Sequence, residues 1–122
     1  MKAFLIDPFK QEVSVVEFTG NYKNIYTHIQ CRVFTACAFD QNGDTVWVDD
    51  EGLLKDLTQQ AFFLIAGYPQ PLAGRGLVLG AGAEGESIAP VTSLEDIKSR
   101  VKFLSLYEAQ MWAGTYGHAG VR

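Results

Sequence analysis

RVFTACAFDQNGDTVWVD, residues 32–49, is the stretch that decides the fold. Its first part, Arg32 to Phe39, is apolar on both faces and rich in β-branched and aromatic residues, which is typical of a central strand. Asn42-Gly43 follows and is a strong hairpin signal, because both residues tolerate the positive φ of a type I′ turn. Thr45 to Asp49 is the predicted returning strand, so the stretch indicates an antiparallel sheet.

Two further strands and a helix are predicted on the N-terminal side of this hairpin. Lys2–Asp7 and Gln11–Phe18 are expected to be strands separated by a turn at Pro8, and the second alternates like a half-buried strand. Asn21 is the expected N-cap of a short helix. The apolar side chains of this helix recur at i, i+3, i+4 and i+7, at Tyr22, Ile25, Tyr26 and Ile29.

The C-terminal side is less regular. Leu57–Ala66 fits either a helix or a strand, and periodicity does not decide between them. Gly76–Gly80 predicts a short strand, and Thr92 with Glu95 has the spacing of a capping box that opens a helix. A last strand is expected over residues 101–106. We expect one domain over residues 1–110, followed by a flexible C-terminal tail over residues 111–122.

These segments predict a single small α+β domain, with a largely antiparallel sheet and two or three short helices packed on one face. A chain of 122 residues that is 48% hydrophobic can build a core without disulfides or metal. No stretch approaches the ~18 consecutive apolar residues of a membrane span, and the apolar run before Asp7-Pro8 is too short for a signal peptide. The expectation is a soluble cytoplasmic protein that binds no membrane.

Charge and cysteine content narrow the partners further. The formal net charge of −4 lacks the basic footprint of a nucleic-acid-binding protein, so no nucleic-acid partner is expected. Cys31 and Cys37 would lie roughly 20 Å apart along an extended strand, too far for a disulfide. They are therefore predicted to be separate free thiols.

Two motifs resemble ligand sites but lack the required context. Gly80–Gly85 matches G-x-G-x-x-G after a strand, yet the following residues block a long helix and Glu84 would repel a phosphate, so a flexible loop is favoured. Carboxylate and amide side chains occupy four positions of a calcium-binding loop: Asp40, Asn42, Asp44 and Glu51. Thr45 replaces the glycine that such a loop needs, so a hairpin tip is favoured.

Residues 68–76, YPQPLAGRG, are the most informative for function. Tyr68, Gln70 and Arg75 are the candidate binding residues, because proline-stiffened loops present such side chains to partners or ligands. Gly74 and Gly76 allow close backbone approach, so backbone amides and the Arg75 guanidinium could meet an anion. The structural alternative is a rigid connection between strands with Arg75 in solvent. No catalytic residue, metal site or cofactor is predicted, since no acid–base pair or metal-ligand spacing is visible.

Three segments in order resemble a family of small proteins encoded by phages, plasmids and other mobile elements. They are Phe4–Pro8, residues 42–55 with NGD and VDDEGLLK, and residues 62–80 with FF, GYPQPLAGRG and LVLG. The family is known as a domain of unknown function, number 3846. The resemblance covers roughly Lys2–Glu86 and the final helix and strand. It implies a bacterial or phage cytosolic setting and brings no catalytic residues.

Three functions therefore remain as hypotheses. The leading one is a non-enzymatic accessory protein of a phage or mobile element that binds a host protein or itself, a homodimer being one form of the latter. The alternative is a binder that sequesters an anionic, nucleotide-like ligand through the glycine-rich region. The weakest is a small enzyme that uses Tyr68, Arg75 and one carboxylate from residues 49–51.

Overall fold

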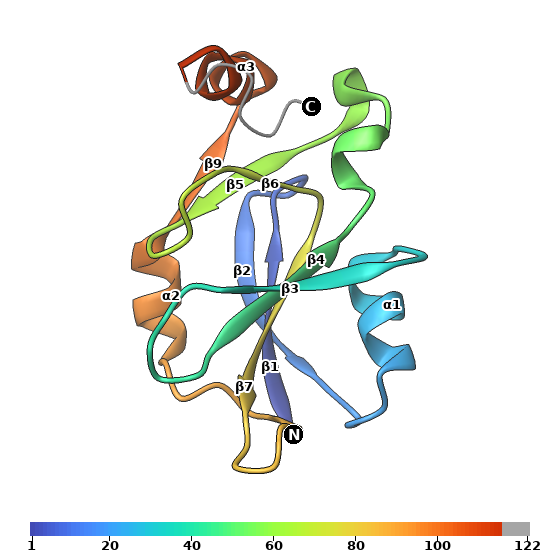
Figure 1. The fold of residues 1–122 in the computed structure, drawn as a ribbon, viewed down its shortest axis with the longest axis vertical. Helices are drawn as coiled ribbons and strands as arrows, with labels where there is room; N and C mark the ends of the chain where they lie inside the picture. The colour runs from blue at the N-terminus through green and yellow to red at the C-terminus, as the bar shows by residue number, and fades with distance from the viewer. Residues whose placement is uncertain (116–122) are drawn as a thin grey trace.

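A computed structural model describes residues 1–115, with side chains through residue 112, and shows two antiparallel sheets and three helices (Figure 1). The larger sheet contains β1 (Lys2–Asp7), β2 (Glu12–Glu17), β3 (Phe34–Ala38), β4 (Thr45–Asp49), β7 (Gly76–Ala81) and β8 (Ser87–Ile88). The smaller sheet contains β5 (Phe62–Ile65), β6 (Leu72–Ala73) and β9 (Val101–Leu104). The helices are α1 (Lys23–Ile29), α2 (Leu94–Arg100) and α3 (Leu106–Thr115), and the 3₁₀ turns are η1 (Gly52–Leu54) and η2 (Leu57–Gln59).

The predicted α+β class and antiparallel sheet are confirmed. The larger sheet has the order β2-β1-β7-β4-β3, with β8 paired to β7, and the smaller has the order β6-β5-β9. The prediction that residues 32–39 form a central strand is wrong, because β3 is an edge strand and β7 lies in the middle. Phe34 packs towards α1 and Cys37 packs towards the smaller sheet, so each face of β3 contributes one side chain to a core, while Ala36 and Ala38 are exposed. Apolar residues on both faces of a strand therefore do not by themselves place it in the centre of a sheet.

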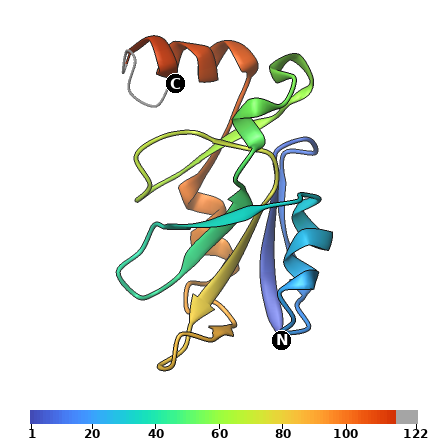
Figure 2. The ribbon, with the colours of Figure 1, turned by 45° about the vertical axis from the view of Figure 1, so that its right-hand side comes forward.

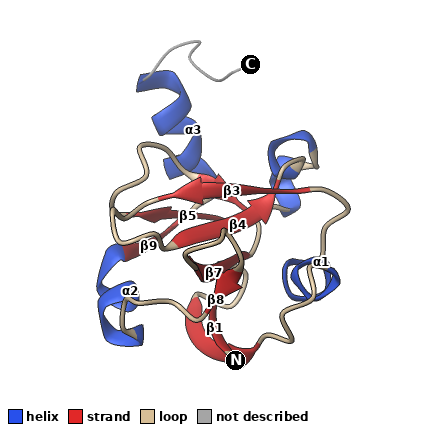
Figure 3. Cartoon of the chain, turned by 60° about the horizontal axis from the view of Figure 1, so that its bottom comes forward, coloured by secondary structure: helices blue, strands red, loops and turns tan. Residues whose placement is uncertain are grey.

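Helices cover both faces of the larger sheet, which corrects the prediction that they pack on one. One core joins Phe4 and Ile6 of β1 to Ile97 of α2 and to the smaller sheet. On the opposite face, Ala3 packs with Ile25 and Ile29 of α1. Figure 2 and Figure 3 show α1 on one side of the strands and α2 on the other. Alternate residues of β1 point to opposite faces, and both sets are apolar, so both faces need a cover.

The hairpin of β3 and β4 is confirmed, but its turn is not a two-residue type I′ turn. Ala38 pairs with Thr45, which leaves residues 39–44 as the loop, and within it only Gly43 has a positive φ, of 95°. The reason is Asp44, which is fully buried and accepts hydrogen bonds from the amides of Val91 and Thr92 at 3.0 and 2.8 Å. The hairpin tip therefore anchors the segment that leads into α2.

Both predicted helix caps are displaced by one residue. Tyr22 occupies the N-cap position of α1, although the Asn21 side chain still accepts from the Lys23 amide at 2.9 Å. At α2 the cap is Ser93, whose hydroxyl accepts from the Asp96 amide at 3.1 Å. The predicted Thr92–Glu95 box does not form, because the Thr92 amide donates to Asp44 and its hydroxyl accepts from Asn42.

The structure resolves two predictions for later segments of the chain, the ambiguous Leu57–Ala66 and the tail over residues 111–122. Leu57–Ala66 begins with the 3₁₀ turn η2 and continues as the strand β5. The predicted tail, residues 111–122, starts inside α3, which continues to Thr115. The rest of that prediction, residues 116–122, lies outside the described residues. Cys31 and Cys37 are free thiols, as predicted.

Candidate functional site

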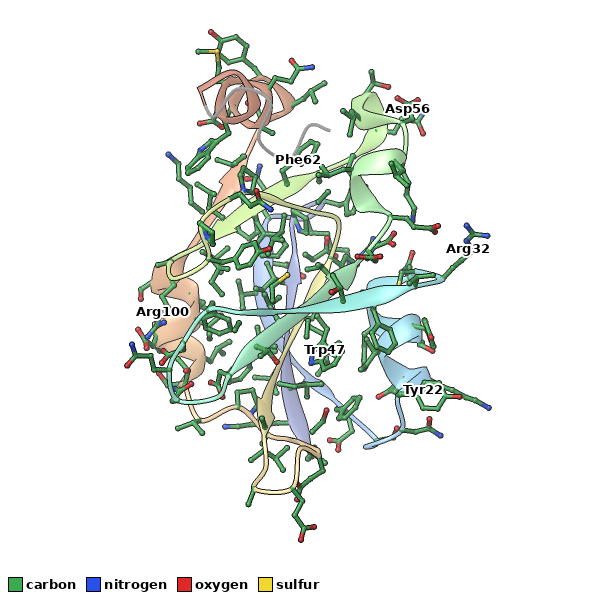
Figure 4. All side chains as sticks on the ribbon, in the orientation of Figure 1. Tyr22, Arg32, Trp47, Asp56, Phe62 and Arg100 are labelled. Atoms are coloured by element: carbon green, nitrogen blue, oxygen red, sulfur yellow. The ribbon has the colours of Figure 1, made fainter. Side chains whose placement is uncertain are left out.

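A pocket of about 270 Å³ lies where the β1–β2 turn, the end of α1, the η1–η2 segment and the β6–β7 turn meet. Figure 4 shows one of its lining residues, Asp56, on the η1–η2 segment. The lining combines two cations, two carboxylates, three glutamine amides and two large apolar side chains. These residues are Phe9, Ile29, Gln30, Asp49, Lys55, Asp56, Gln59, Gln60, Gly74 and Arg75.

Arg75 occupies the turn between β6 and β7, next to Gly74. Gly74 has a φ of +85°, a conformation that favours glycine, and its amide donates to the Ala61 carbonyl at 2.8 Å. This turn connects the smaller sheet to the larger one, and Arg75 lines the pocket with only 22% of its side chain exposed. The backbone conformation of Gly74 thus helps to fix the position of the Arg75 guanidinium.

The β1–β2 turn holds the Arg75 guanidinium from one side. Asp7, which is buried, accepts from Arg75 Nε at 3.4 Å, and its other oxygen accepts from the amides of Phe9 and Lys10. The guanidinium carbon lies 4.7 Å from the centre of the Phe9 ring, a cation–π contact. Within the described part of the chain, Arg75 makes no other hydrogen bond or ion pair. Both Nη groups therefore remain able to donate.

The second cation of the pocket already has a carboxylate partner. Lys55 Nζ lies 2.6 Å from Asp49 Oδ2, and Asp49 Oδ1 accepts from the Glu51 amide at 2.9 Å. Hydrogen bonds from the Thr58 hydroxyl and amide hold the pKa of the Asp56 carboxyl below its ordinary value. Asp49 and Asp56 are thus both engaged within the chain, and the charges of the lining nearly balance.

Glutamine amides supply the remaining polar groups. Gln60 is committed, since its Nε2 donates to the Gly52 carbonyl at 2.9 Å and its Oε1 accepts from the Ala61 amide. The side chains of Gln30 and Gln59 make no hydrogen bond with any described residue. A ligand in this pocket would meet two Nη groups and two free carboxamides beside the Phe9 ring.

The structure brings together two of the five predicted binding residues, Gly74 and Arg75. Tyr68 packs against the core on the other side of β6 and shares a hydrogen bond with Cys37 and another with Gln70. The hydrogen bond to Cys37 and partial burial raise the pKa of Tyr68. Neither Tyr68 nor Gln70 lines the pocket, so the loop does not present a single surface.

Gly76 is a packing residue. It is buried in β7, and an added Cβ would lie 2.7 Å from Val46 Cγ2 and 2.8 Å from Phe63 Cζ. Its lack of a side chain lets the two sheets approach, and it does not line the pocket. Although Gly76 is next to Arg75 in the sequence, its role is therefore in the packing of the core.

The glycine-rich loop over residues 80–85 is separate from Arg75. The two lie at opposite ends of β7, roughly 20 Å apart for a strand of this length. The Glu86 carboxylate folds back onto the loop and accepts from the Glu84 amide at 3.0 Å. The Glu86 carboxylate thus already accepts from the loop amide that a bound phosphate would use. The structure gives the loop and Arg75 no common site.

The residues of the calcium-loop pattern have structural partners instead. Asp40 pairs with Arg100 at 2.7 Å, Asp44 binds the two amides described above, and Glu51 pairs with Arg32 at 3.0 Å. Among the described residues no group of three or more His, Cys, Asp or Glu side chains is placed to hold a metal ion.

Most of the residues that make the pocket were not predicted as site residues. Asp7, which holds Arg75, was assigned only to the end of a strand and Phe9 only to the turn after it, and Gln59 and Gln60 fell in the ambiguous segment. Gly52 has a clear role in hindsight, because an added Cβ would lie 2.9 Å from the Ala73 carbonyl oxygen, so only glycine lets η1 seat against β6. The available signal was the unusual GLLKD break after β4.

Comparisons with known proteins identify the family of this chain. Residues 1–102 match the family described as Domain of unknown function (DUF3846), and the chain belongs to that family. The chain is also similar to Uncharacterized protein y4iR of Sinorhizobium fredii (strain NBRC 101917 / NGR234), with 32% identity over 97 residues. That match covers 77% of this chain and 58% of the relative, so the chain spans little more than half of that curated protein. No solved structure matches significantly.

Membrane insertion through a helix has no support in the described residues. None of the helices within residues 1–115 has both the length and the apolar character needed to cross a bilayer.

Proposed function

We propose that this protein is a non-enzymatic binding protein whose Arg75 pocket takes a small ligand bearing a carboxylate or monophosphate group. The observation that supports it is the state of Arg75: Asp7 and Phe9 hold one side of the guanidinium, and its Nη groups have no partner among the described residues. A guanidinium held in this way is pre-oriented for two parallel hydrogen bonds to an oxyanion.

The charge balance of the pocket supports a ligand of low charge. Lys55 is neutralised by Asp49 and Arg75 already faces Asp7. A polyphosphate would add several negative charges beside Asp49 and Asp56, which is unfavourable at these distances. At about 270 Å³ the pocket lies below the usual range of roughly 300–1,000 Å³ for drug-sized ligands. These features favour a small acid over the larger nucleotide of the sequence-based alternative.

The non-enzymatic part of the proposal is supported by the chemistry of the lining. Asp49 and Asp56 already accept hydrogen bonds from the chain, and the pocket lining contains no histidine or cysteine. A general base needs a free carboxylate or imidazole within reach of the substrate. A role as an accessory protein of a mobile element stays part of the proposal through the family resemblance.

Thermal unfolding with single probes tests the proposal. Succinate, inorganic phosphate and adenosine monophosphate are added to the full chain at constant ionic strength. Succinate or phosphate should raise the melting temperature, and a ligand at a hundredfold excess over its Kd stabilises by about 2.7 kcal/mol. Arg75→Gln should abolish the shift. Arg32→Gln is the matched control, because Arg32 is 84% exposed and lies outside the pocket. An equal shift in both variants, or no shift in the wild type, contradicts the proposal.

A further inference from the structure

The outer edge of β3 carries a regular set of backbone groups that pair with no described residue. Within residues 1–115, β3 pairs only with β4 and ends the larger sheet. The Asp50 amide donates to the Val33 carbonyl at 2.8 Å, so the backbone groups of Val33 point towards β4. Backbone groups alternate in direction along a strand, so those of Thr35 and Cys37 also point towards β4. The N–H and C=O groups of the three residues between and after them point outward. These residues are Phe34, Ala36 and Ala38.

This edge lacks the features that normally prevent strands from pairing. Its five residues, FTACA, include no charged side chain and no proline. The opposite edge of the same sheet, β2, carries Glu12 and Glu17. Ala36 and Ala38 are exposed, and their small side chains leave the backbone accessible. One edge of the sheet is therefore protected by charge and the other is open.

We infer that the β3 edge pairs with the same edge of a second copy of this chain, antiparallel about a two-fold axis at Ala36. In this register Ala36 faces its own counterpart, and Phe34 faces Ala38 of the second copy at both ends. Each of these three pairs exchanges two backbone hydrogen bonds, so every outward group of β3 is satisfied. A register shifted by two residues leaves one outward residue on each strand unpaired. The large Phe34 side chain also meets the small Ala38 side chain on the same face.

Charge at the ends of the strand favours a second copy over an unrelated strand. The same register carries Arg32 of one copy opposite Asp40 of the other, and the two-fold axis repeats this at the second end. Unlike charges meet at both ends, although Arg32 and Asp40 also pair with Glu51 and Arg100 within the chain. The strand thus supplies both members of the complementary set. The surface is separate from the Arg75 pocket, so the inference does not depend on the proposed ligand.

Reversible charge at the two-fold axis tests this inference. The mass of the full chain is measured by sedimentation across the micromolar range. The wild type should have the mass of two chains of 13.5 kDa each. Ala36→Lys and Ala36→Glu each place like charges against each other across the axis, and each should weaken association at least tenfold. An equimolar mixture of the two variants should recover the dimer, because the introduced lysine then faces the introduced glutamate.

A charge on the other edge is the matched control. Val15→Lys adds a lysine to β2, where Val15 is 51% exposed, and should leave the dimer unchanged. Circular dichroism of each variant checks that the fold is retained. A wild type that stays monomeric overturns the inference and leaves the edge to a strand of another protein. Dimerisation of both Ala36 variants, or no recovery in the mixture, overturns it as well.

Discussion

Replacing Asp44 by asparagine should destabilise the domain by about 2–4 kcal/mol. Asp44 is fully buried, and its two oxygens accept from the Val91 amide at 3.0 Å and the Thr92 amide at 2.8 Å. Asparagine has the same shape but one acceptor, so it keeps one of these bonds without the charge. Its NH₂ group then faces the other amide, which loses its acceptor. A weakened charged bond and one unsatisfied buried donor together give the expected magnitude.

Urea unfolding followed by circular dichroism measures this loss. With a slope of about 2 kcal/mol per molar urea, the midpoint should fall by roughly 1–2 M while the slope stays constant. Hydrogen exchange should accelerate at Val91 and Thr92. Asp56→Asn is the control, because Asp56 caps the exposed turn η2 and should matter much less. A midpoint for Asp44→Asn no lower than that of the control would refute the assignment of Asp44 as the anchor of the segment before α2.

Two further outcomes follow from packing and ionisation. Gly76→Ala should destabilise the domain by about 1–3 kcal/mol, because the added methyl group overpacks against Val46 and Phe63. Gly82→Ala is the control, since its methyl group meets only the flexible end of Glu86. Equal denaturation midpoints for the two variants would contradict this. Burial raises the pKa of Cys37 above its ordinary 9.0, and the Cys37 hydrogen bond raises that of Tyr68 above 10.0. Because the folded state holds these two protons more tightly, their contribution to the free energy of unfolding is fully present below pH 9. This contribution is lost as the pH rises through 9 and 10. Urea titrations from pH 8 to 10.5 should show this decline, and it should be shallower with Cys37→Ala and Tyr68→Phe combined; identical slopes would argue against it.

Local patterns predicted much of the fold, because alternation and helical spacing report which side chains are buried. β1 was located at Lys2–Asp7, and Ile25 and Ile29 were placed on the buried stripe of α1. The predictions that were wrong concern residues whose structure depends on partners distant in the sequence. Thr92 has an ideal capping spacing, but Asp44, 48 residues away, takes its amide. β3 has the composition of a central strand, yet no strand of the described residues pairs with its second side.

The candidate site was predicted in its cation but not in its surroundings. Arg75 between two glycines was a candidate binding residue of the sequence, and the structure places it in the pocket lining. Its holding carboxylate, Asp7, lies 68 residues away, and no local pattern links the two. Tyr68 and Arg75 are close in sequence, but β6 separates them, since a strand of only two residues suffices to send flanking side chains to different surfaces.

The most direct test of the Arg75 pocket is an NMR titration that follows the Arg75 side-chain Nε–H signal while succinate or phosphate is added to the full chain. Binding to the Nη groups should shift this signal, together with the side-chain amides of Gln30 and Gln59, with one common Kd. Arg75→Gln should remove the shifts of both glutamines. Shifts confined to exposed lysines, or glutamine shifts that persist in Arg75→Gln, would contradict the assignment of this pocket as an oxyanion site.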